Sequence, residues 1–90
     1  MTPLQRERLN AACAALQAAG ARVLHGRLLL AGEAALTTPF DHARWQTFMN
    51  VLAQARSWAS IRDGVACEEA RRTQVRDAIG LLWAVTEEEP

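Results

Sequence analysis

Lysine is absent from this 90-residue sequence, and its ten arginines are balanced by ten acidic residues, so that the formal net charge is zero. A balanced chain lacks the positive charge with which proteins bind the phosphate backbone, and we expect no nucleic-acid partner. The exclusive use of arginine is typical of a GC-rich genome. The alternative is selection for the planar, bidentate contacts that guanidinium groups make with anions.

Long apolar runs and cysteine clusters are also missing. The longest uninterrupted apolar run, residues 11–16, is too short to span a bilayer, and the polar N-terminus does not resemble a signal peptide. Cys13 and Cys67 lie in helix-like contexts without the spacing of a metal or redox motif, so we expect two small buried thiols. The sequence therefore predicts a cytoplasmic protein of bacterial or phage origin, with no metal, no other cofactor and no membrane contact.

Catalytic motifs are absent too, including a serine nucleophile elbow, a phosphate loop and a paired-histidine metal motif. His42 lies beside Asp41, but adjacent residues of a helix point about 100° apart. No acidic residue or cysteine lies near His25 in the sequence to orient it. We expect a chain that is not an enzyme.

The hydrophobic content is high, but much of it is alanine. Half of the residues are hydrophobic, yet alanine favours helix and buries little area. We expect a single domain over residues 1–85 with one small core, followed by a mobile acidic tail over 86–90. A core with few large side chains favours help from a second copy or another protein.

Two Thr-Pro pairs have the pattern of helix starts, in which threonine caps the helix and proline takes its first position. At the first pair, Gln5 completes a capping box with Thr2. At the second pair, Asp41 follows Thr38 and places a carboxylate in the first turn. Apolar residues at spacings of three and four then predict helices over 3–19, 39–61 and 67–85.

The inward faces of these helices follow from the same spacing. Gly80 falls inside the last helix, and a glycine there suggests a close approach to another backbone. The residues expected to face the core are Leu9, Ala12, Cys13, Leu16 and Ala19, then Phe40, Trp45, Phe48, Met49, Val51, Leu52, Ala55, Trp58 and Ala59, then Val75, Ala78, Ile79, Leu82 and Trp83.

The segment that decides the fold class is ARVLHGRLLL, residues 21–30. Its central His25-Gly26 pair matches a two-residue hairpin turn in which glycine takes positive φ. With Gly20 and Gly32 on either side, a helix would contain three glycines within thirteen residues, at roughly 1 kcal/mol each. The pattern therefore predicts two short antiparallel strands, 21–24 and 27–30, packed on helices in an α+β domain of order α-β-β-α-α.

The open edge of this hairpin is the favoured partner-binding site. An unprotected edge strand accepts a strand of another chain by β-augmentation, and Arg22 and Arg27 beside it would hold an acidic partner. This mechanism predicts a docking or adaptor module that binds a peptide.

The alternative is a small phage-encoded regulator or inhibitor of a host protein, acting through a helical face edged with tryptophan. Trp58 and Trp83 fall beside the apolar stripes, where they serve either the core or a partner. The predicted partner-binding residues of both surfaces are Arg22, Val23, Leu24, Arg27, Leu28, Leu29, Trp58 and Trp83.

Arginines cluster on the last predicted helix at Arg71, Arg72 and Arg76. Glu68 and Glu69 lie four and three residues before Arg72, a spacing that favours ion pairs on an exposed face. The alternative is a small patch that binds an anion or an acidic peptide.

The order of these features resembles the small N-terminal docking domains of hybrid nonribosomal peptide synthetases, over residues 4–55. Gly26-Arg27-Leu28 matches their hairpin turn exit, and Leu36-Thr37-Thr38-Pro39 matches their Leu-Thr-Pro helix start with one added threonine. The resemblance implies that a strand edge receives a short peptide from an upstream protein. This chain differs in its third helix and in the tryptophan- and phenylalanine-rich helix that replaces a lysine-containing one.

Overall fold

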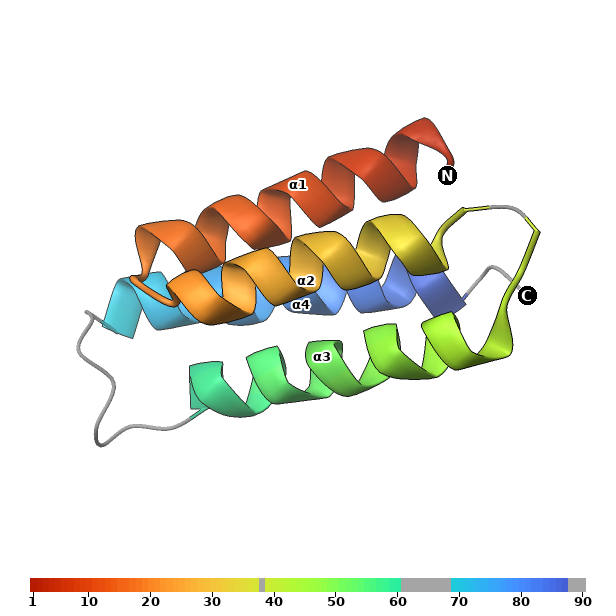
Figure 1. Ribbon diagram of the computed structural model, residues 1–90. Helices are drawn as coiled ribbons and strands as arrows, with labels where there is room; N and C mark the ends of the chain where they lie inside the picture. The colour runs from red at the N-terminus through yellow and green to blue at the C-terminus, as the bar shows by residue number, and fades with distance from the viewer. Residues whose placement is uncertain (38, 61–68, 88–90) are drawn as a thin grey trace.

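The described residues, 1–37, 39–60 and 69–87, form four helices in the computed structural model. Figure 1 shows that consecutive helices run antiparallel. Each helix packs against two others, while the diagonal pairs α1/α3 and α2/α4 make no backbone contact. The chain is therefore an up-and-down four-helix bundle. The helices are α1 (Pro3–Ala18), α2 (Arg22–Ala35), α3 (His42–Ser60) and α4 (Glu69–Glu87).

The predicted hairpin is wrong, and with it the α+β class. Residues 22–35 form α2, and no strand occurs in the part of the chain that the structure describes. Leu28 is fully buried and Ala35 is 4 % exposed, and the two lie two turns apart on the face that packs against α1 and α3. Most helical stability in proteins comes from packing of this kind, and here it outweighs the cost of the glycines.

The three glycines that suggested a hairpin have three different roles. Gly20 has φ +87° and ends α1, as predicted, with the Ala21 N–H donating to the Leu16 carbonyl over 2.9 Å. Gly32 lies against α1, where an added Cβ would come within 2.6 Å of Leu9 Cδ1. Gly26 lies within α2, where an added Cβ would meet no atom within 4 Å, and its φ is not positive. One of the three is therefore a helix terminator.

The first predicted helix start is confirmed and the second is displaced. The Gln5 N–H donates to Thr2 Oγ1 over 3.1 Å, and the Thr2 N–H donates to Gln5 Oε1 over 2.9 Å, which completes the capping box. Helix α3 begins at His42 rather than at Pro39. Asp41 caps it by accepting a hydrogen bond of 3.0 Å from the Arg44 N–H, since a carboxylate at this position is at least as good a cap as threonine. Thr38 lies outside the described residues.

The predicted inward faces are confirmed along α1, α3 and α4. Phe40 is the exception, because it precedes α3, is 53 % exposed and rests on the Trp45 ring at a centroid distance of 5.6 Å. Residues 61, 67, 68 and 88–90, where helix ends and the acidic tail were predicted, lie outside the described residues. Thr86, which was expected in that tail, is fully buried in the last turn of α4. The fully buried large side chains are Leu9, Leu16, Leu28, Phe48, Leu52, Val75, Ile79, Leu82 and Thr86.

The close approach expected at Gly80 is wrong, because a Cβ there meets no atom within 4 Å. We expect Gly80→Ala and Gly26→Ala each to stabilise the protein by about 0.5–1 kcal/mol, since alanine restricts the unfolded chain and fits the helix. Gly32→Ala must displace Leu9, and we expect it to destabilise the protein by about 1–3 kcal/mol. Urea unfolding followed by circular dichroism measures all three, and a destabilised Gly26→Ala variant would instead support the hairpin.

Candidate functional site

The residues predicted for the hairpin edge do not share one surface. Arg22, Val23 and Arg27 are exposed on the outer side of α2. Leu28 is fully buried on the opposite side, and the residues between, Leu24 and Leu29, are half-buried and packed against the core. The helix therefore separates residues that two strands would have placed along one edge.

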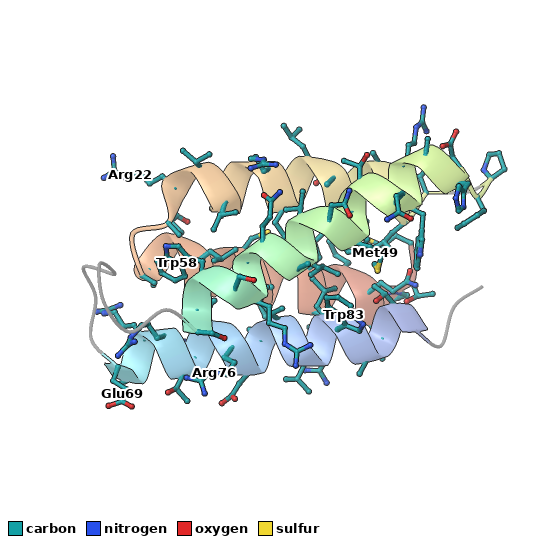
Figure 2. The ribbon with its side chains drawn as sticks, turned by 90° about the horizontal axis from the view of Figure 1, so that it is seen from below. Arg22, Met49, Trp58, Glu69, Arg76 and Trp83 are labelled. Carbon is teal, nitrogen blue, oxygen red and sulfur yellow. The ribbon has the colours of Figure 1, made fainter. Side chains whose placement is uncertain are left out.

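The two tryptophans predicted at an interface are half-buried and lie on different sides of α3. Figure 2 shows Trp83 of α4 in the seam between α3 and α4, and Trp58 on the part of α3 that is turned toward α2. Trp58 follows Arg56 by two residues, so the two side chains leave α3 about 160° apart. Arg56 lies on the α4 side together with Trp83. The structure therefore keeps Trp83 as a candidate site residue and assigns Trp58 to the edge of the core.

A groove of about 400 Å³ lies between α3 and α4 and is open to solvent. Three of its described lining residues, Ser60, Gly80 and Ala84, are small and leave space beside the larger side chains. A Cβ added at Gly80 meets no atom within 4 Å. The lining residues are Arg56 and Ser60 of α3, and Arg76, Ile79, Gly80, Trp83 and Ala84 of α4.

Two guanidinium groups give the groove its charge. Arg56 and Arg76 are both exposed, and neither forms a side-chain hydrogen bond or ion pair with any residue that the structure describes. Among the residues that the structure describes, no carboxylate lines the groove. A planar guanidinium binds a carboxylate through two parallel hydrogen bonds, and an indole face packs against apolar or planar groups. The groove therefore suits a ligand that carries both an anionic and an apolar part.

The three arginines of the cluster predicted on α4 have different surroundings in the structure. The Arg71 Nη1 donates to the Ala18 carbonyl over 3.1 Å and so satisfies a free backbone acceptor at the C-terminus of α1. Arg72 is half-buried and has a partner of its own. Arg76 is the member of the cluster that opens onto the groove.

Sequence patterns do not select Arg56, Ser60 or Ala84 as site residues. The signal for them is weak, since each lies at four-residue spacing from another lining residue: Arg56 with Ser60, and Ala84 with Gly80. That spacing places residues on one flank of a helix. The packing of the bundle decides which neighbouring helix these residues face.

The histidines do not form a site. His25 lies in the first turn of α2 and His42 begins α3, so they lie at opposite ends of two antiparallel helices, roughly 15 Å apart along the axis. Within the described ranges, no three His, Cys, Asp or Glu side chains come close enough together to hold a metal ion.

Comparisons with protein-family models, with curated proteins and with solved structures find no match to this chain. The resemblance to synthetase docking domains stays a prediction, and the hairpin that it implies is not part of the described fold. Among the four described helices, none has the length and apolar character needed to cross a membrane. The functional argument therefore rests on the chemistry of the groove.

Cys13 behaves as a buried apolar residue, as predicted, while Cys67 lies outside the described residues. The Cys13 thiol is free and 4 % exposed. Burial raises its pKa from 9.0 to about 11, and the negative charge of Glu33 adds to the increase. Since the thiolate is the reactive form, Cys13 is a poor nucleophile at neutral pH.

We expect the free energy of unfolding of a Cys67→Ser variant to fall between pH 9 and pH 11. Over this range the unfolded chain releases the Cys13 proton while the folded chain retains it, and the total loss is about 2–3 kcal/mol. Lysine and tyrosine are absent, so no other side chain titrates in this window. Urea unfolding at several pH values measures the effect. A control with Cys13→Ala added should show no such fall, and an equal fall in both variants would contradict the assignment.

Proposed function

We propose that this chain is a non-enzymatic protein-interaction module that binds an acidic helical segment of a partner protein in the groove between α3 and α4. The observation that carries the proposal is the pair of exposed guanidinium groups, Arg56 and Arg76, on either side of a groove whose lining is part polar and part apolar. No described residue neutralises either of them.

The shape of the groove favours a helix as its occupant. The lining residues of α4 recur at Arg76, Gly80 and Trp83, and those of α3 are Arg56 and Ser60, so the groove follows the helix axes for about two turns. Small-molecule sites bury most of their ligand, whereas this groove is open to solvent along one side. An amphipathic helix in a groove between helices is a common mode of peptide recognition.

The charge of the groove favours an acidic segment. Carboxylates on the polar face of the bound helix would reach Arg56 on α3 and Arg76 on α4, while its apolar face would cover Trp83 and Ala84. Like-charge contacts would disfavour a basic segment, so the two arginines contribute mainly to the choice of partner and to the association rate.

This mode of binding agrees with a helical-face mechanism and replaces strand addition, which has no strand edge within the described residues. A docking or adaptor protein and a small regulator or inhibitor of another protein would both use the groove in this way. A cytoplasmic location is part of the proposal, since the free thiol of Cys13 suits a reducing compartment.

Titration with synthetic amphipathic peptides tests the proposal. Three peptides of about five turns would share the same apolar face and carry Glu, Gln or Lys on the polar face. We expect the Glu peptide to bind the wild-type protein and to shift the indole N–H signal of Trp83 in NMR spectra, with the Trp58 signal as an internal reference. Binding should weaken with added salt, because exposed ion pairs are screened.

Two variants of the groove give the matched comparison. Gly80→Leu places a side chain in the open space of the groove, and we expect it to abolish binding, while Ala11→Leu on the exposed face of α1 should bind normally. In the double variant Arg56→Glu/Arg76→Glu, the affinity for the Glu peptide should fall by about tenfold, since each exposed ion pair contributes about 0.2–1 kcal/mol. Arg44→Glu, outside the groove, is its control. Equal affinity for all three peptides, or full binding by Gly80→Leu, would refute the proposal.

A further inference from the structure

We infer that the outer face of α2 binds the same face of a second copy of this chain, and that the two α2 helices pair in antiparallel orientation. Val23 is 73 % exposed and Leu30 is 72 % exposed, and no other large hydrophobic residue in the described ranges is as exposed. Both belong to one helix. Isolated apolar residues on a surface are ordinary, but two on one stripe of one helix form a candidate contact.

The spacing along α2 suits the pairing of two helices. Val23 and Leu30 are seven residues apart, which is two turns, so they lie on the same stripe of the helix. Gly26 lies between them with open space around it. In an antiparallel pair centred near Gly26, Val23 of each copy meets Leu30 of the other. The missing side chain at the centre allows the two backbones to approach each other closely.

The charges of α2 identify a second copy, in antiparallel orientation, as the occupant. Arg22 and Arg27 lie in the N-terminal half of the exposed face, and Glu33 lies in its C-terminal half. An antiparallel pair with Val23 opposite Leu30 therefore places Arg22 of each copy near Glu33 of the other, twice in one dimer, whereas a parallel pair places like charges together. Glu33 also binds Arg6 of its own chain at 3.0 Å, and both side chains remain about half exposed.

The size of the face predicts a reversible dimer. One pair of 14-residue helices buries less than the roughly 1,200–2,000 Å² of a stable interface. The dimer would therefore form at high protein concentration and dissociate on dilution. Because α2 is diagonal to α4 in the bundle, this dimer would leave the α3/α4 groove of both copies open. The inference does not depend on what the groove binds.

Sedimentation equilibrium over about 10 µM to 1 mM tests the dimer, since these concentrations correspond to weak association. We expect the apparent mass of the wild-type protein to rise from 9.9 kDa toward twice that value. Leu30→Glu should raise the dissociation constant by about tenfold or more, as expected for the loss of one anchor residue. Leu81→Glu changes another exposed leucine, on α4, and should dimerise as the wild type does. Circular dichroism checks that both variants remain folded.

A charge exchange tests the antiparallel arrangement itself. Arg22→Glu and Glu33→Arg should each weaken dimerisation, because each places like charges together twice in a homodimer. An equal mixture of the two variants should dimerise again, since both contacts of the mixed pair then join opposite charges. A wild-type mass that stays at 9.9 kDa up to 1 mM, an unchanged dimer in Leu30→Glu, or a mixture that does not recover would overturn the inference.

Discussion

The packing of one side of α2 against α1 and α3 is the contact on which the rest of the structure depends. Leu28 is fully buried, and Gly32 lies so close to Leu9 that a Cβ would have no space. These contacts hold residues 22–35 in a helix despite two internal glycines, and they turn the remaining side of that helix outward. If the same residues formed a hairpin, α1 and α3 would lose their shared neighbour and the bundle could not close.

The bundle is asymmetric in how well its seams are filled. The seam between α1 and α2 is tight enough to need a glycine, whereas the seam between α3 and α4 remains open around Gly80. A groove of this kind sacrifices buried area in a small core, which costs stability. Among the described residues, six of the seventeen buried hydrophobic side chains are alanine, so the core has little apolar area to spare. The two arginines beside the groove add a charge preference to its apolar lining residues.

The exposed surfaces proposed for binding lie at different corners of the bundle. The α2 face is apolar with charges at both ends, and its charge pattern is complementary to itself. The described lining of the α3/α4 groove is part apolar and part polar and carries only positive charges, so it is not complementary to itself and requires a different partner. A dimer joined through α2 would present two grooves, and a partner with two acidic segments would then bind with an avidity set by the distance between them.

The sequence by itself determined the helices that have strong local signals. The Thr2–Gln5 capping box, the stop at Gly20 and the apolar stripes of the helices predicted over 39–61 and 67–85 depend on interactions within a few residues. Each is present, with the two helices described over 42–60 and 69–87. Only the tertiary structure decided whether residues 22–35 form a helix or a hairpin, and where the groove lies. The His25-Gly26 pair and the short apolar runs beside it are compatible with a turn or with a helix when local energies alone are compared. The balance was set by Leu28 and Gly32 meeting α1 and α3, contacts that no spacing in the sequence specifies. For the same reason, the opposition of Arg56 and Arg76 across one seam follows from which flanks of α3 and α4 face each other in the bundle.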